Sequence, residues 1–309
     1  MPDNFADRLM ATMECKGSRV CLGLDPRPDD LPNTPDGEVL PSEALMESVV
    51  HFCERVLFAC LDYVAAVKLQ SAFFEQLGMT GTAAFHHLAE AAQEHGLITI
   101  ADVKRGDIGS TAEAYAEAYL GGRKPSPFDA VTLTPYFGVD SIAPFAARAA
   151  ALGKGLFVVV RASNPSAAEL QDLRLDDGRR VHEAVADLVV GWGQDETLVG
   201  KCGYSAVGAV VGATARDRIA DLRQRLSGRP LLVPGYGAQG AGPDDVVAAF
   251  DHQGLGAIVN SSRGILYAYK SPPYAARYGA RDFAAAAAEA ARNTREAINE
   301  ALRRAGNLA

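Results

Sequence analysis

Several features that would point to familiar classes of protein are missing from this 309-residue chain. The five cysteines form no CxxC pair and no group with histidine, so neither a disulfide framework nor a metal site is expected. No apolar run approaches the roughly 18 residues of a membrane span, and acidic residues occupy the N-terminal segment where a signal peptide would be apolar. We therefore expect a soluble cytoplasmic protein with reduced thiols and no membrane partner.

Positive charge is also scarce. Lysine and arginine total 30 against 38 aspartate and glutamate residues, which gives a formal net charge of -8. General nucleic-acid binders are more often basic, so this balance argues against a nucleic-acid partner. It is compatible with a small anionic ligand, because a few local cations are enough to bind one.

Common catalytic and cofactor motifs are absent as well. The sequence contains no HExxH, GxSxG or Walker pattern, and no GxGxxG follows the first predicted strand. No internal repeat has a fixed period, and no linker is rich enough in turn residues to split the chain into domains. The function must therefore be inferred from the order of the predicted elements and from the polar residues between them.

Short apolar or β-branched runs recur along the chain, with helical patterns between them. Most of these runs are continuous rather than alternating, as expected for parallel strands that are covered on both faces. The alternation predicts an α/β fold, a single-domain (β/α)8 TIM barrel over 1–309 with an alanine-rich C-terminal helix at about 282–304. A doubly wound open sheet is the second possibility. The eight predicted strands span 20–24, 64–69, 97–103, 130–134, 155–160, 206–211, 231–233 and 257–260.

The third predicted strand carries an unusual cluster of charges. Strand side chains alternate between faces, so Asp102 and Lys104 are expected on the same face, and Asp107 follows just past the end of the strand. Burying such charges is costly unless they pair with one another. The C-terminal ends of the strands are where α/β barrels place their active sites. Considered alone, the segment could also be a solvated loop of charges.

Polar residues occur at other predicted strand ends. Asp25 ends the first strand and Ser163 follows the fifth. Lys68 lies within the apolar second strand, where a lysine is seldom needed for packing, although it could extend its ammonium to solvent from a strand edge.

The segments after the last two strands suggest a phosphate site. The glycine-rich segment 233–242 follows the seventh strand, and Arg263 follows the eighth. Loops at these two positions frequently bind phosphate in barrels of this kind. Glycines let backbone N–H groups approach an anion, and an arginine offers a planar, permanently charged fork. We therefore expect an anion to bind here.

Taken together, these segments resemble the orotidine 5'-phosphate decarboxylase family, in particular its longer bacterial subgroup. The resemblance runs from about Phe5 to Tyr274 in the right order and spacing. The DxKxxD element is specific at the level of the superfamily, and its combination with the glycine-rich and arginine segments is highly specific. The matching segments are LGLDPRP (22–28), VKLQSAFFE (67–75), DVKRGDIGSTA (102–112), TLTPYFG (132–138), VRASNP (160–165), VPGYGAQG (233–240) and VNSSRGI (259–265).

The resemblance implies both an activity and an assembly. It implies decarboxylation of orotidine 5'-phosphate to uridine 5'-phosphate, the last step of de novo UMP synthesis, without a metal or an organic cofactor. It also implies a homodimer whose active sites lie at the subunit interface. The implied catalytic array is Lys68, Asp102, Lys104 and Asp107, with Lys104 as the proton donor and Asp107 reaching into the partner's site.

The resemblance also implies how the substrate would be held. Asp25 and Lys68 would hold the ribose hydroxyls, and Ser163 would contact the pyrimidine. The remaining implied binding residues fall into two groups. Ile108 and Thr111 would cross the interface with Asp107, and the phosphate would be held by Gln239 and Arg263, with Pro234 at the base of a closing loop.

One residue departs from the pattern, and three further functions stay open. Many shorter family members have glycine immediately before the phosphate arginine, where this chain has Ser262, so the backbone N–H groups that hold the phosphate are not specified. The DxKxxD element also occurs in related barrel decarboxylases that act on keto-sugar phosphates with Mg²⁺. The same residues are also compatible with a lysine Schiff-base aldolase and with a non-catalytic protein that binds a phosphate ligand.

Overall fold

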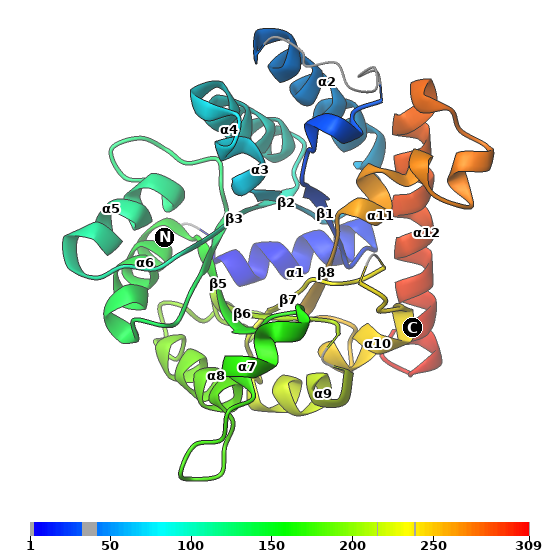
Figure 1. Cartoon of the computed structure of the whole chain (residues 1–309). Coiled ribbons are helices and arrows are strands. Elements are labelled where there is room, and N and C mark those ends of the chain that lie inside the picture. Colours follow the sequence, from blue (N-terminus) through cyan, green and yellow to red (C-terminus); the bar gives the residue numbers. More distant parts are fainter. Residues whose placement is uncertain (1–2, 33–41, 215, 238, 309) are drawn as a thin grey trace.

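The computed structural model describes residues 3–32, 42–214, 216–237 and 239–308, and these form a closed barrel of eight parallel strands (Figure 1). The strands follow one another around the barrel in sequence order, and β8 pairs with β1. The predicted (β/α)8 barrel is therefore confirmed, and the open sheet is wrong. The strands are β1 (Val20–Leu24), β2 (Ala66–Gln70), β3 (Ile98–Arg105), β4 (Ala130–Leu133), β5 (Gly155–Arg161), β6 (Val207–Val211), β7 (Leu231–Val233) and β8 (Ala257–Ser261).

Helices surround the barrel, and their apolar faces pack on the strands. The longest, α12, coincides with the alanine-rich segment and packs against α2, where the centre of the Phe283 ring lies 5.0 Å from that of the Phe52 ring; several of its alanines are buried. Among the described residues, none of the helices has the length and apolar character needed to cross a bilayer. The helices are α1 (Phe5–Lys16), α2 (Ser42–Cys60), α3 (Ala72–Glu75), α4 (Gly78–Glu94), α5 (Gly109–Leu120), α6 (Val139–Leu152), α7 (Ala168–Gln171), α8 (Val181–Trp192), α9 (Arg216–Arg225), α10 (Pro243–Val246), α11 (Arg263–Leu266) and α12 (Phe283–Arg304).

Helix α1 closes the end of the barrel at which the strands begin, and Figure 1 shows it lying across the ring of strands. The side chain of Asn4 caps its first turn by accepting a hydrogen bond from Ala6 N at 2.7 Å. The helix ends at Gly17, which adopts φ 54°. The ring of Phe5 occupies the place where a side chain at Gly155 would begin, since a Cβ there would lie 2.2 Å from the ring. The absence of a side chain at Gly155 therefore lets α1 lie directly against β5.

A buried carboxylate ties α1 to the strands. Asp129, which immediately precedes β4, is 2% exposed, and its Oδ1 accepts a hydrogen bond from Arg8 Nη1 at 2.7 Å. Its Oδ2 accepts from the backbone N–H of Thr99 at 3.0 Å, and Lys154 Nζ lies 3.9 Å from its Oδ1. Asp129 therefore joins α1, β3, β4 and the start of β5 at the closed end, far from the strand ends that carry the predicted site.

Asp129→Ala is expected to destabilise the protein by about 2–4 kcal/mol, because it leaves a buried N–H and two cations without their shared acceptor. Urea unfolding would measure the change, with the exposed Asp176→Ala as the control that should leave the midpoint unchanged. An Asp129→Ala variant as stable as the wild type would show that this cluster does not hold the barrel end together.

Candidate active site

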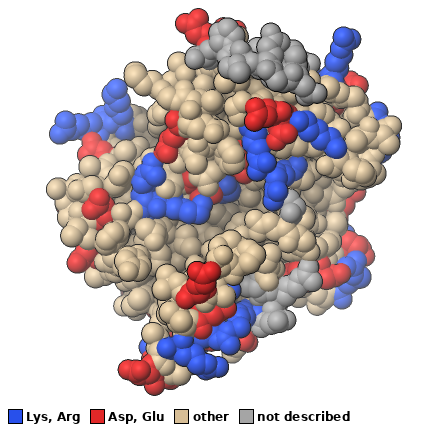
Figure 2. All heavy atoms as spheres, viewed as in Figure 1, with Lys and Arg blue, Asp and Glu red and all other residues tan. Residues whose placement is uncertain are grey.

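A cavity of about 320 Å³ opens at the C-terminal ends of the strands. Figure 2 shows it as a hollow in the face of the molecule, with lysine and arginine side chains around it. Residues from all eight strand ends, or from the loops that follow them, contribute to its wall. Eight of the residues predicted from the sequence line it: Asp25, Lys68, Asp102, Lys104, Ser163, Pro234, Gln239 and Arg263.

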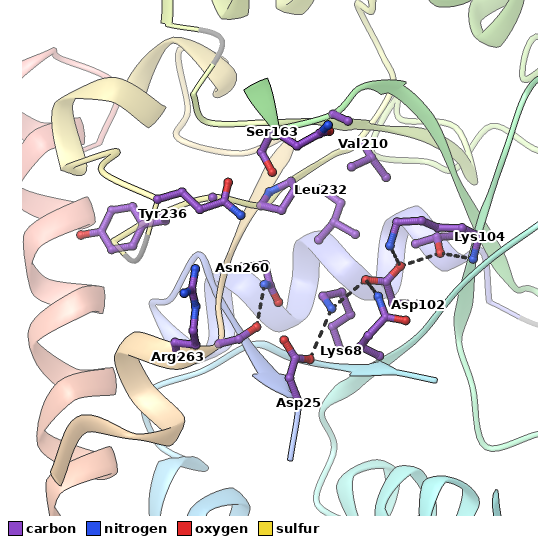
Figure 3. Close-up of a pocket in the computed structure, with 18 of the residues that line it drawn as sticks. Asp25, Lys68, Asp102, Lys104, Ser163, Val210, Leu232, Tyr236, Asn260 and Arg263 are labelled. Atoms are coloured by element: carbon purple, nitrogen blue, oxygen red, sulfur yellow. Dashed lines mark hydrogen bonds and ion pairs between the residues drawn. The ribbon is translucent and has the colours of Figure 1, made fainter. Parts of the chain in front are cut away.

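Four of these residues form a row of alternating charge across β1, β2 and β3. Lys68 Nζ lies 3.8 Å from Asp25 Oδ1 and 2.8 Å from Asp102 Oδ2. Lys104 Nζ lies 2.6 Å from Asp102 Oδ1. The side chains of Lys68 and Asp102 are 5% and 9% exposed, whereas that of Lys104 is half exposed. The row therefore begins in the barrel interior and ends with an ammonium at the open cavity (Figure 3).

The two buried members of the row stabilise each other's charged forms. Burial alone would raise the pKa of Asp102, but the ammonium groups of Lys68 and Lys104 hold that pKa well below its usual range. Burial alone would lower the pKa of Lys68, but the carboxylates of Asp102 and Asp25 hold it above its usual range. Both groups are therefore charged at neutral pH, and a solvated loop does not describe this segment.

Asp102 also accepts hydrogen bonds from two residues that the sequence analysis missed. Gln70 Nε2 donates to its Oδ2 at 3.1 Å, and the Thr132 hydroxyl donates to its Oδ1 at 2.8 Å. Strand alternation could have indicated Gln70, because it lies two residues after Lys68 on β2. Thr132 lies within a segment of the family pattern, but nothing in its own sequence pointed to a contact with Asp102.

The opposite end of the cavity carries Arg263 and Tyr236, well separated from Lys104 in Figure 3. Arg263 begins α11 directly after β8. Ser262, before it, packs so closely on β1 that a Cβ at Gly23 would lie 1.9 Å from its Oγ. The Ser262 hydroxyl also accepts a hydrogen bond from Asn260 Nδ2 at 3.2 Å. The serine side chain thus faces β1 and β8, where it helps to fix the start of α11.

Other lining residues were not identified from the sequence as site residues. Arg27 follows Asp25 and places its guanidinium 5.8 Å from the centre of the Phe73 ring, as expected for a cation–π contact. Burial raises the pKa of Tyr236 to about 12, so its hydroxyl is a neutral donor at physiological pH. Arg27 and Tyr236 belong to segments of the family pattern, which was the available signal. The remaining lining residues include Asn164, Val159, Val210 and Leu232.

Three predicted residues do not line this cavity. Asp107, Ile108 and Thr111 lie at the beginning of α5, and the Ile108 side chain is 55% exposed. Asp107 Oδ1 accepts a hydrogen bond from Ile108 N at 2.8 Å. Within the chain itself, the charged row therefore has four members, and Asp107 is outside it. In the described part of the chain, no three His, Cys, Asp or Glu side chains are grouped so that they could hold a metal ion.

The depressed pKa of Asp102 predicts a specific loss of stability in acid. The pKa of Asp102 in the folded protein lies below its value of about 3.9 in the unfolded chain. The carboxylate therefore contributes fully to the stability of the fold above about pH 3.9, and this contribution declines as the pH falls toward the folded-state pKa. The stability advantage of wild type over Asp102→Asn should therefore decrease by about 1 kcal/mol between pH 5 and pH 3.

Urea unfolding of both proteins at each pH would measure this difference. The exposed Asp176→Asn provides a matched control for the loss of one carboxylate. A difference between wild type and Asp102→Asn that is constant with pH would contradict the low pKa.

Comparison with known proteins agrees with this geometry. The sequence profile described as "Orotidine 5'-phosphate decarboxylase / HUMPS family" matches residues 18–278. The chain is 45% identical to an orotidine 5'-phosphate decarboxylase of Rhodopirellula baltica, covering 86% of this chain and 89% of the relative. It is 40% identical to an orotidine 5'-phosphate decarboxylase of Caldicellulosiruptor saccharolyticus, covering 97% of this chain and 99% of the relative.

A solved structure supports the same assignment. The structure of Leishmania donovani OMP decarboxylase superimposes with a TM-score of 0.74 at 31% identity, covering 96% of this chain and 98% of that one. The profile match and the relatives thus extend over the barrel and include every segment that lines the cavity. The chain belongs to the orotidine 5'-phosphate decarboxylase / HUMPS family.

Proposed function

We propose that this protein decarboxylates orotidine 5'-phosphate to uridine 5'-phosphate, the last step of de novo UMP synthesis. The observation that carries the proposal is the row Asp25, Lys68, Asp102 and Lys104, which ends with a half-exposed ammonium at the cavity. The curated relatives that are 38–45% identical are named for this activity. Their names and the charged row point to the same chemistry.

The reaction requires stabilisation of negative charge on carbon. Cleavage of the bond between C6 and the carboxylate releases CO₂ and leaves the electron pair on C6 of the pyrimidine. The ammonium of Lys104 stabilises this pair electrostatically and then transfers a proton to C6, which completes uridine 5'-phosphate. Asp102 fixes the ammonium through the 2.6 Å contact, so its position is set before the substrate arrives.

The substrate would span the cavity from Lys104 to Arg263. In the proposed pose, Asp25 and Lys68 hold the ribose hydroxyls and Ser163 contacts the pyrimidine. Gln239 and Arg263 hold the phosphate, with Pro234 at the base of the loop. The placement of Arg263 and Lys104 at opposite ends supports this pose, because the phosphate and C6 lie on opposite sides of the ribose. Binding energy from the remote phosphate could then drive closure over the reacting end.

We also propose that the protein is a homodimer with shared active sites. Asp107, Ile108 and Thr111 would reach into the partner's site, where Asp107 would complete the charged array. Exposed apolar side chains support an interface here: Ile108, Tyr136, Phe137 and Val139 are 50–79% exposed, and the Phe137 ring lies beside Gly106. Exposed apolar groups that lie close together often mark contacts between proteins.

The proposal includes neither a metal nor an organic cofactor, because Lys104 supplies both the charge and the proton. Activity that survives EDTA would distinguish it from the related decarboxylases that act on keto-sugar phosphates with Mg²⁺. We further propose a cytoplasmic location, which is supported by the five cysteines, all of which are free thiols.

Purified protein is expected to consume orotidine 5'-phosphate, and Lys104→Ala should lower the turnover by about 10³-fold or more while the fold is retained. The decrease in substrate absorbance measures the rate, and circular dichroism checks the fold. Lys124→Ala removes an exposed lysine that does not line the cavity and should match the wild type.

Two outcomes would count against this assignment. A wild-type protein without turnover would overturn the proposed function itself. A Lys104→Ala variant that retains turnover within tenfold of the wild type would show that another group donates the proton.

Mixing inactive Lys104→Ala with inactive Asp107→Ala should restore activity if the sites are shared. In a mixed dimer, one site collects both substitutions and the other is wild type. Random exchange makes about half of the dimers mixed, so roughly a quarter of the wild-type activity should return.

Each variant alone, taken through the same exchange procedure, is the control, and differently tagged subunits verify that exchange occurred. A mixture that stays inactive despite verified exchange would place Asp107 and Lys104 of the same chain in one site.

A further inference from the structure

Strand β3 is irregular at the point where it enters the active site. It pairs with β4 through Ala101 and Val131, and pairing resumes only at Arg105 and Leu133. Three residues of β3 therefore lie opposite a single residue of β4, Thr132. Within the described part of the chain, Lys104 is also the one non-glycine residue with a positive φ, at 43°. Residues other than glycine seldom adopt this conformation, so surrounding contacts must stabilise it.

The Thr132 hydroxyl makes those contacts. Its Oγ1 accepts hydrogen bonds from the backbone N–H groups of Val103 and Lys104, both at 3.0 Å. It donates its proton to Asp102 Oδ1 at 2.8 Å. A hydroxyl has one proton and two lone pairs, so all three of its bonding positions are occupied. Thr132 is fully buried, which prevents water from substituting for any of these partners.

Through these bonds, Thr132 links the backbone of Lys104 to the carboxylate of Asp102, which the Lys104 ammonium also contacts. Asp102 Oδ1 receives both the Thr132 hydroxyl and the Lys104 ammonium. One oxygen atom of Thr132 thus fixes the two ends of the Lys104 side chain: its backbone directly, and its ammonium through Asp102. Among the described residues of the cavity wall, Thr132 alone hydrogen-bonds both to Asp102 and to the backbone of Lys104.

We propose that Thr132 is a positioning residue, whose hydroxyl holds Lys104 and Asp102 in register for proton transfer to the substrate. This inference rests on the proposed decarboxylase function. Valine in place of threonine would keep the shape but remove the hydroxyl, so the buried N–H of Val103 and the partly buried N–H of Lys104 would lose their acceptor and Asp102 would have one donor fewer. The strand could then relax from the bulge, and Lys104 would move relative to C6. The phosphate contacts at the opposite end would be unaffected.

Steady-state kinetics with orotidine 5'-phosphate tests the proposal. Thr132→Val should lower kcat by about 10- to 100-fold, as expected for a small misplacement of a reacting group, with KM changed by less than about threefold. Thr132→Ser keeps the hydroxyl and should restore kcat to within about threefold of the wild type. Circular dichroism and thermal unfolding monitor the fold of each variant.

Thr99→Val is the matched control. Thr99 is as fully buried as Thr132 but lies on β3, and its hydroxyl donates to the carbonyl oxygen of Pro127 at 2.6 Å, at the closed end of the barrel. Its loss should lower thermal stability but leave kcat near the wild-type value. If Thr132→Val does not fold, Thr132→Cys replaces it, because a thiol is a weak donor and acceptor. Its kcat should fall below that of Thr132→Ser.

The outcomes separate this inference from the function on which it rests. A wild-type protein without turnover overturns the proposed function. With an active wild type, three results would overturn the positioning role. The first is a kcat of Thr132→Val, or of Thr132→Cys, that equals the kcat of Thr132→Ser. The others are a Thr132→Val variant in which only KM changes, and a Thr99→Val variant whose kcat falls as far as that of Thr132→Val.

Discussion

The candidate active site depends on one buried carboxylate. Asp102 accepts from Lys68 and Gln70 on one oxygen and from Lys104 and Thr132 on the other, so four donors surround it. A carboxylate this deeply buried would otherwise be neutral, and an ammonium as buried as Lys68 would lose its proton. Each charge is maintained because the other is present. The whole row therefore forms a single electrostatic unit rather than a set of independent residues.

In the proposed mechanism, this unit places the charged groups before the substrate binds. The two donors on Oδ2 come from β2, while those on Oδ1 come from β3 and β4, so three adjacent strands fix the carboxylate. Electrostatic catalysis is most effective when the dipoles and charges are oriented before the reaction begins. The barrel strands supply that orientation, whereas Pro234, Gln239 and Arg263, the residues proposed to lie around the phosphate, come from the segments after β7 and β8. In the proposed pose, the reacting groups therefore lie on strands and the phosphate-binding groups lie in the segments that follow strands.

The two ends of the barrel serve different purposes, and each has its own buried aspartate. Asp129 at the closed end joins α1 to the strands through Arg8 and Thr99 and takes no part in the cavity. Asp102 at the open end holds groups that line the cavity. Strand β3 contributes to both clusters, since Thr99 lies near its beginning and Asp102 beyond its middle. This strand thus connects the Asp129 cluster at the closed end with the charged row at the cavity.

The sequence alone was enough to predict the barrel and eight of the residues that line the cavity. Continuous apolar strands alternating with helices specify parallel strands, and parallel strands bring their C-terminal ends to one face, so Asp25, Lys68, Asp102 and Arg263 had to lie near one another. The tertiary structure alone decided how these residues are held. The bulge in β3, the positive φ of Lys104 and the bonds from Thr132 depend on contacts between strands about 30 residues apart. Periodicity within one strand cannot specify them, because it fixes the face on which a side chain lies but not the partner across the sheet.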